Sequence, residues 1–89
     1  MYAVLVVVEI APGRHEESLR ALQEHIIPMC KGAPGFVRGT WFGNEKSGNS
    51  LMVFDSEQSA RQMAGQVGSN AEDPVQITST QVYEVHGEA

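Results

Sequence analysis

The first strand of the sequence, residues 2–10, constrains the fold most because it is apolar on both sides. Side chains of a strand point alternately to its two faces. The apolar residues of one face have even numbers and those of the other have odd numbers: Tyr2, Val4, Val6, Val8 and Ile10 against Ala3, Leu5 and Val7. The helices of a short chain can cover only one of these faces. The other face therefore needs a further cover.

The segments that follow predict a first helix and then a hairpin. After the turn at Pro12-Gly13, apolar residues recur at three- and four-residue spacing, as on one face of a helix. Pro28 lacks an amide hydrogen, so regular helix is expected to stop or kink near Ile27, with Lys31-Gly32 finishing the element. Residues 36–43 then predict a second strand, residues 43–49 a polar hairpin loop, and residues 51–54 a third, antiparallel strand.

The last third of the chain completes a β-α-β-β-α-β order. Asp55 or Ser56 is expected to cap a second helix, which Gly68 ends. After a loop over residues 69–74, a final strand is predicted over residues 75–85. At 89 residues, with 42% hydrophobic and 19% charged residues and no linker, residues 1–89 are expected to form a single domain. The fold class is α+β, with a ferredoxin-like antiparallel sheet.

Charge and cysteine content exclude several kinds of partner. The net charge is −5, and the six cationic residues are scattered, which argues against nucleic acid. The apolar run Val4–Val8 ends at Glu9, too short to cross a bilayer or to act as a signal peptide, so no membrane partner is expected. Cys30 is the only cysteine, so no internal disulfide can form. A cytoplasmic location is the expectation.

Four segments together resemble the dimeric α+β barrel superfamily, and within it the small proteins similar to antibiotic biosynthesis monooxygenase domains. They are the opening strand, the Pro34-Gly35-Phe36-Val37 entry to strand two with Trp41, the segment Val53-Phe54-Asp55-Ser56-Glu57, and the closing Val82-Tyr83-Glu84-Val85. The resemblance implies a ferredoxin-like subunit whose open sheet face packs against a second copy to make a barrel. The members of the superfamily that the chain resembles include cofactor-free monooxygenases, haem-degrading enzymes and proteins without known activity.

The haem-degrading members of that superfamily arrange an asparagine, a tryptophan and a histidine round the porphyrin. Strand one of this chain has no asparagine to match, and Trp41 lies in a different element. No catalytic residue is therefore carried over from the resemblance, since the superfamily hosts several reactions.

Three residues are the candidates for ligand binding: His25, Arg38 and Trp41. Trp41 could wall an aromatic pocket, although large aromatic residues more often pack a core or an interface. Arg38 could hold an anionic or enolate-like group, although such a side chain more often reaches solvent or pairs with an acid such as Glu9. Because Arg38 and Trp41 are three positions apart on one strand, they are expected to point to opposite faces unless a bulge intervenes.

The remaining nucleophilic and titratable residues carry weaker signals. His25 borders the inward stripe of helix one, whereas His15 and His86 are expected in solvent and at a frayed end. Cys30 has no activating neighbour in sequence and predicts a small buried or loop thiol. No metal cluster or phosphate-binding glycine loop is present, so no cofactor or metal is expected.

The preferred hypothesis is a homodimer that binds a small apolar or aromatic organic molecule between helix one and the sheet. It could act as a cofactor-independent monooxygenase, in which an electron-rich enolate or phenolate substrate itself supplies electrons to oxygen. The alternative is a non-enzymatic ligand-binding or interaction module whose aromatic residues only pack. Haem binding or degradation ranks third.

Overall fold

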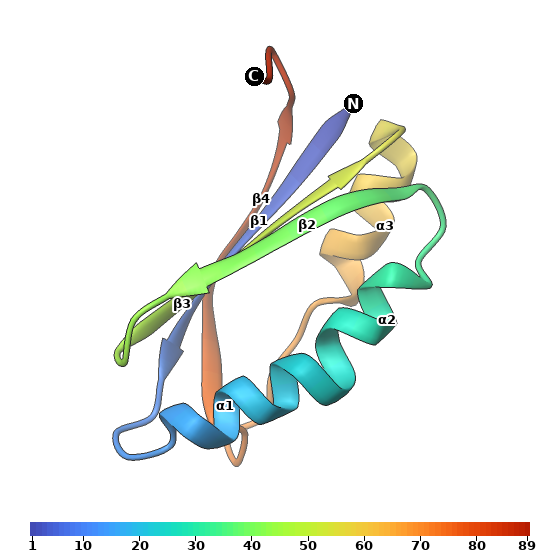
Figure 1. Cartoon of the computed structure of the whole chain (residues 1–89). Coiled ribbons are helices and arrows are strands. Elements are labelled where there is room, and N and C mark those ends of the chain that lie inside the picture. Colours follow the sequence, from blue (N-terminus) through green and yellow to red (C-terminus); the bar gives the residue numbers. More distant parts are fainter.

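The computed structural model describes all of residues 1–89 and contains a four-stranded antiparallel sheet with helices on one face (Figure 1). The strand order is β2-β3-β1-β4, so the apolar first strand lies inside the sheet. The elements follow the chain in this order: β1 (Tyr2–Ile10), α1 (His15–Ala21), the π-helix η1 (Leu22–Ile26), α2 (Ile27–Lys31), β2 (Phe36–Gly43), β3 (Ser47–Phe54), α3 (Glu57–Gln66) and β4 (Val75–Glu84). The predicted α+β, ferredoxin-like class is confirmed.

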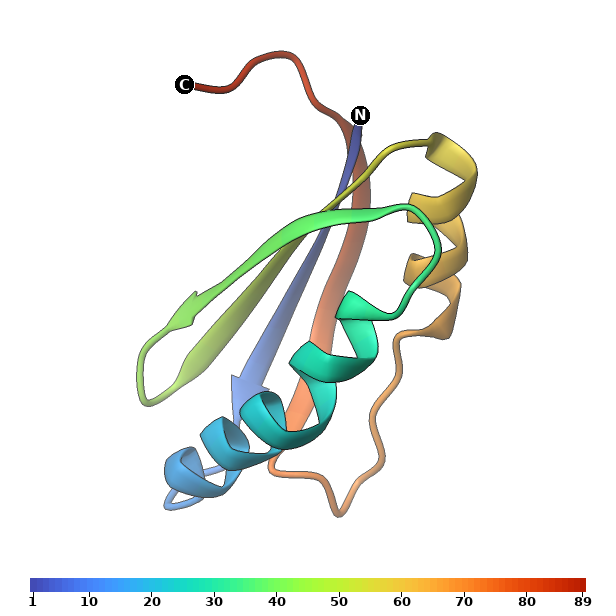
Figure 2. The same cartoon turned by 45° about the vertical axis from the view of Figure 1, so that its right-hand side comes forward.

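The register of β1 shows which of its faces the helices cover. Val4 pairs with Met52 on β3 and with Val82 on β4, and Val4 and Met52 belong to one buried cluster with Ala60 and Met63 of α3. The even-numbered residues of β1 therefore face the helices. The odd-numbered residues face the opposite side, which no helix covers and which we call the open face (Figure 2).

The core is concentrated under α3. Phe54 and Val4 are fully buried there, and the rings of Phe36 and Phe54 meet edge to face with centroids 5.8 Å apart. Ser56 caps α3 by accepting a hydrogen bond from the amide of Ser59 at 3.2 Å. This decides between the two predicted capping residues. The helix ends at Gln66, two residues before Gly68.

The first helix differs from the prediction in how it accommodates Pro28. Helical structure continues from His15 to Lys31 without a break, but residues 22–26 form a π-helix in which the amide of Ile27 donates to the carbonyl of Leu22. Pro28 has no amide hydrogen to give to the carbonyl four residues earlier, and its ring would crowd that carbonyl. The wider turn relieves this conflict on the N-terminal side of the proline, and the element still ends at Lys31.

The β2–β3 hairpin is tighter than predicted. Strand β3 begins at Ser47, so only residues 44–46 lie between the strands. The side-chain oxygen of Asn44 accepts from the amides of Lys46 at 2.9 Å and Ser47 at 3.0 Å, and this closes the turn. Ser47, Gly48 and Asn49, which the sequence placed in a loop, therefore pair with β1.

A bulge at the start of β2 sets which side chains face the helices. Phe36 is opposite Phe54, and Arg38 is opposite the preceding residue of β3, so Val37 is the extra residue. From Arg38 to Trp41 the register is regular. Arg38 and Trp41 therefore lie on opposite faces of the sheet, as their spacing predicts.

Replacing Met63 by Ala tests the location of the core. Met63 is 4% exposed and packs in the cluster under α3, so we expect Met63→Ala to lower the free energy of unfolding by about 2–5 kcal/mol in urea titration. Met29 is 59% exposed on α2, and Met29→Ala is the matched control, with an expected loss within about 0.5 kcal/mol. Equal losses for the two variants would contradict this arrangement.

Candidate functional site

A cavity of about 600 Å³ lies between the first helical segment and the sheet. Its walls come from α1, η1 and α2 on one side, and from β1, β2 and β3 on the other. The β2–β3 hairpin and the segment from Gln66 to Val75 border its ends. Its volume is within the range of small-molecule sites.

The helical wall of the cavity is an apolar stripe that the sheet does not fully cover. Leu19, Ile26 and Met29 line the cavity and are 42%, 39% and 59% exposed. Leu22 and His25 belong to the same stripe, since they recur at three- and four-residue spacing. His25 lies at this wall on the π-turn and is exposed. A ligand in the cavity would remove this apolar surface from water.

The floor of the cavity is the helix-facing side of the sheet, to which the edge strand β2 contributes Trp41. Trp41 lies opposite Ser50, and Ser50 in turn lies opposite Val6 on β1. A Cβ at Gly39 would come within 2.6 Å of the indole ring, so Gly39 is the residue that lets the ring lie against β2. The indole Nε1 is buried and has no hydrogen-bond partner.

The polar groups that line the cavity differ in whether the chain already satisfies them. Asn44, Asn49, Ser69 and Asp73 are engaged in turns and backbone hydrogen bonds. The side chains of His15, His25, Ser50 and Gln66 make no hydrogen bond within the chain. With the indole N–H of Trp41, these four are the polar side-chain groups of the lining that the chain leaves without a partner. His15 and Ser50 were missed by the sequence analysis.

The lining carries no cationic side chain of lysine or arginine, and Asp73 is its only acidic residue. Arg14 lies just before α1, but its guanidinium is bonded to Glu17 at 2.6 and 2.9 Å and to the carbonyl of Glu72 at 2.8 Å. This pairing holds the pKa of Glu17 below its usual range. No group of three His, Cys, Asp or Glu side chains converges as metal ligands would. The cavity lining therefore has no fixed positive charge from lysine or arginine.

Arg38 lies outside this cavity, on the open face. It is ion-paired with Glu88 of the C-terminal tail. The tail starts at the edge strand β4, and Figure 2 shows it leaving the sheet on the side away from α3. A ligand contact from Arg38 would need a site on the open face. His86, in the same tail, is exposed, with Nε2 3.5 Å from Glu84.

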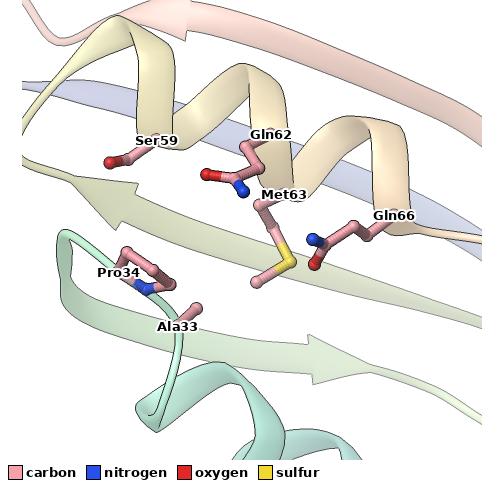
Figure 3. Close-up of a pocket in the computed structure, with 6 residues that line it drawn as sticks. All are labelled: Ala33, Pro34, Ser59, Gln62, Met63 and Gln66. Atoms are coloured by element: carbon pink, nitrogen blue, oxygen red, sulfur yellow. The ribbon is translucent and has the colours of Figure 1, made fainter.

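A second, much smaller crevice lies between the α2–β2 loop and α3 (Figure 3). Its volume is about 10 Å³, and Ala33, Pro34, Ser59 and Gln62 line it together with Met63 and Gln66. This is room for about one water molecule. No organic ligand fits there, so the large cavity is the candidate site.

The comparisons with known proteins place the chain by fold. No protein-family model matches it, and no curated protein matches its sequence. Its fold is the ferredoxin-like fold of the haem degrader MhuD from Mycobacterium tuberculosis, solved with two haems bound in its active site. That structure is 16% identical with a TM-score of 0.73, over 100% of this chain and 99% of MhuD.

A second solved structure with the same fold is an arginine-to-serine mutant of MhuD with two manganese protoporphyrin IX molecules bound per active site. It is also 16% identical, with a TM-score of 0.68, over 100% of this chain and 98% of the other. At such low identity the likeness establishes the fold and no activity.

No helix of this chain is both long and apolar enough to cross a membrane.

Cys30 is predicted to be unreactive in the folded protein. It is 1% exposed, its Sγ lies 3.4 Å from the sulfur of Met52, and burial raises the pKa of the thiol. Since the thiolate is the reactive form, we expect labelling by a disulfide reagent at pH 8 to be at least about 100-fold slower in buffer than in denaturing urea. Equal rates in the two conditions would show that α2 does not bury this thiol.

Proposed function

We propose that this protein binds a neutral, largely apolar aromatic molecule in the cavity between the first helical segment and the sheet. The observation that carries the proposal is the cavity itself, about 600 Å³ with 16 hydrophobic residues among the 30 that line it. The helical stripe of Leu19, Ile26 and Met29 is left partly exposed there, and Trp41 offers an aromatic floor. A site with apolar walls and a few polar groups suits such a ligand.

The charge of the lining supports a neutral ligand. A carboxylate placed among Leu19, Leu22 and Ile26 would lose hydration, and the lining has no lysine or arginine to compensate. The acidic Asp73 at the border would oppose an anion further.

Haem is the second candidate ligand, favoured by the shared fold with MhuD, whose structures hold haem and manganese protoporphyrin IX. His15 and His25 are imidazoles in the cavity lining that could approach an iron. Against haem, its two propionates are anionic and the lining has no cation for them. Strand β1 also has no asparagine, and its residues in the lining are Val6, Val8 and Ile10. Haem therefore ranks below a neutral aromatic ligand.

Oxygenation without a cofactor is the reaction that this site would support. An activated CH₂ group of the substrate would lose a proton, and the carbanion would pass electrons to O₂ to form a hydroperoxide. Loss of water then gives a carbonyl, so that R₂CH₂ + O₂ becomes R₂CO + H₂O. His25 is the proposed base, because its imidazole lines the cavity with no partner in the chain. The non-enzymatic rival is a carrier that binds the same ligand without turnover.

We also propose that the open face forms a homodimer. By the register, Leu5 and Val7 of β1 lie on this face next to Leu51 of β3, which is 38% exposed. Tyr83 of β4, opposite Ala3, is 51% exposed on the same face. A contiguous apolar face of a sheet is typical of an interface, and a second copy would present the same surface. The whole chain would then act as one domain within the dimer.

Calorimetric titration with 2-naphthol, 2-naphthoate and haemin tests the ligand class. We expect 2-naphthol to bind and 2-naphthoate to bind at least about tenfold more weakly, because its carboxylate is uncompensated in the cavity. Trp41→Ala and His25→Ala should weaken binding of 2-naphthol. Arg38→Ala is the matched control, since Arg38 lies on the other face, and should leave the affinity unchanged.

The outcome of that titration separates the alternatives. A haemin complex with a Soret band and an affinity above that of 2-naphthol would favour the haem hypothesis. Binding of neutral aromatic compounds with no oxygen uptake for any oxidisable ligand would favour the carrier. Absence of all binding would overturn the proposed site.

Replacing Val7 by Lys tests the dimer. A charge in the middle of the open face cannot be buried without a partner, so we expect the variant to sediment as a monomer or to become insoluble, while the wild type sediments as a dimer at micromolar concentration. Gln23→Lys adds the same charge on the exposed side of the first helix and should remain dimeric. A monomeric wild type, or a Val7→Lys variant with unchanged mass, would contradict the proposed dimer.

A further inference from the structure

Ser50 interrupts the apolar pattern of the cavity floor. On β3 the helix-facing positions are Gly48, Ser50, Met52 and Phe54, and Met52 and Phe54 are buried in the core. Ser50 lies in the next row, between Trp41 on β2 and Val6 on β1. Its hydroxyl is thus at the middle of the floor, facing the helical wall across the cavity.

The hydroxyl of Ser50 is distinguished from the other serine hydroxyls of the cavity by its lack of a partner. Ser18 donates to the carbonyl of His15 at 2.6 Å, Ser47 bonds to Asn44 at 3.4 Å, and Ser69 accepts from the amide of Ile77 at 3.2 Å. Ser50 makes no side-chain hydrogen bond within the chain. Ser50 is half-buried and its hydroxyl is open to the cavity, since the only buried side-chain polar atom without a partner is the Nε1 of Trp41, so a ligand oxygen can reach the hydroxyl.

We propose that Ser50 is the residue that orients the ligand and selects among aromatic molecules, by a hydrogen bond to a hydroxyl or carbonyl oxygen of the ligand. The proposal rests on the proposed ligand site and narrows its substrate class to neutral phenols and aromatic ketones. A serine hydroxyl both donates and accepts, so either group satisfies it. The aromatic body of the ligand then lies between the floor at Trp41 and the helical stripe at Leu22 and Ile26.

This geometry assigns different tasks to the free polar groups of the cavity. Ser50 is on a strand inside the sheet, paired on both sides, so its position is fixed by the ladder. His25 is on the π-turn of the opposite wall. A ligand whose oxygen is held by Ser50 presents its ring to that wall, and Ser50 is therefore a positioning and specificity residue.

A matched pair of probes tests this role. The probes are 2-naphthol and 2-methylnaphthalene, which have nearly the same shape and differ in the hydrogen-bonding group. We expect Ser50→Ala to weaken 2-naphthol binding by about two- to tenfold, the equivalent of one net hydrogen bond, and to leave 2-methylnaphthalene unchanged or tighter. Ser50→Thr keeps the hydroxyl and should preserve the wild-type ratio of the two dissociation constants.

Thr80→Val is the control for loss of a hydroxyl from the same row of the sheet. Thr80 pairs with Val6 from the other side and does not line the cavity. The ratio of the dissociation constants of the two probes should therefore stay at the wild-type value. Trp41 is the only tryptophan, and its single indole N–H signal in NMR spectra reports whether each probe enters the cavity and whether each variant remains folded.

The outcomes distinguish the proposed role of Ser50 from the proposed ligand site on which it depends. If the wild type binds both probes and Ser50→Ala changes both dissociation constants equally or neither, the role of Ser50 is overturned while the ligand site stands. If the wild type binds neither probe, the ligand site itself fails, and the ligand contact of Ser50 fails with it. If Ser50→Ala does not fold, Ser50→Thr and Ser50→Gly test the role of Ser50 instead, by the ratio of the dissociation constants of 2-naphthol and 2-methylnaphthalene.

Discussion

The pairing of β1 with both β3 and β4 is the constraint on which the rest of the structure depends. Because β1 is bonded on both sides, each of its side chains is committed to one face of the sheet. Val4 and Val6 are thereby buried toward the helices, and Leu5 and Val7 are placed on the face without helices. A slip of one residue would exchange the two sets and turn Leu5 and Val7 toward the helices in place of Val4 and Val6.

The cavity follows from an uneven distribution of side-chain volume along the helix-facing side of the sheet. Near α3 the rows contain Phe36, Phe54 and Met52, which fill the space beneath that helix. Toward the hairpin the corresponding positions are Ser50 and the glycines at 43 and 48, which fill little of the space above the sheet. Trp41 is the large side chain in the row of Ser50, but its ring lies back against Gly39, so a space remains between this half of the sheet and the first helical segment.

The sequence predicted the elements set by periodicity better than those set by local chemistry. Alternation in β1 and the spacing between Arg38 and Trp41 placed these residues on the correct faces, since the pleat fixes side-chain direction. The early start of β3 was missed because Ser47 and Asn49 have the composition of a loop, and only the Asn44 turn brings them into the ladder. The vacant hydrogen-bonding capacity of Ser50 could be recognised only once the partners of every other serine in the cavity were known. The only indication in the sequence was that Ser50 is a polar residue at a helix-facing position of β3.

The ion pair between Arg38 and Glu88 carries the C-terminal tail from one edge of the sheet to the other. In the register, Arg38 is opposite Val53, and Val53 is opposite Ala3. Ala3 and Val53 are the buried residues of the open face, at 7% and 5% exposure, and they lie in the row that the tail crosses. An affinity tag fused after Ala89 would begin directly over this face. The choice of terminus for a tag therefore decides whether purified protein presents its native surface.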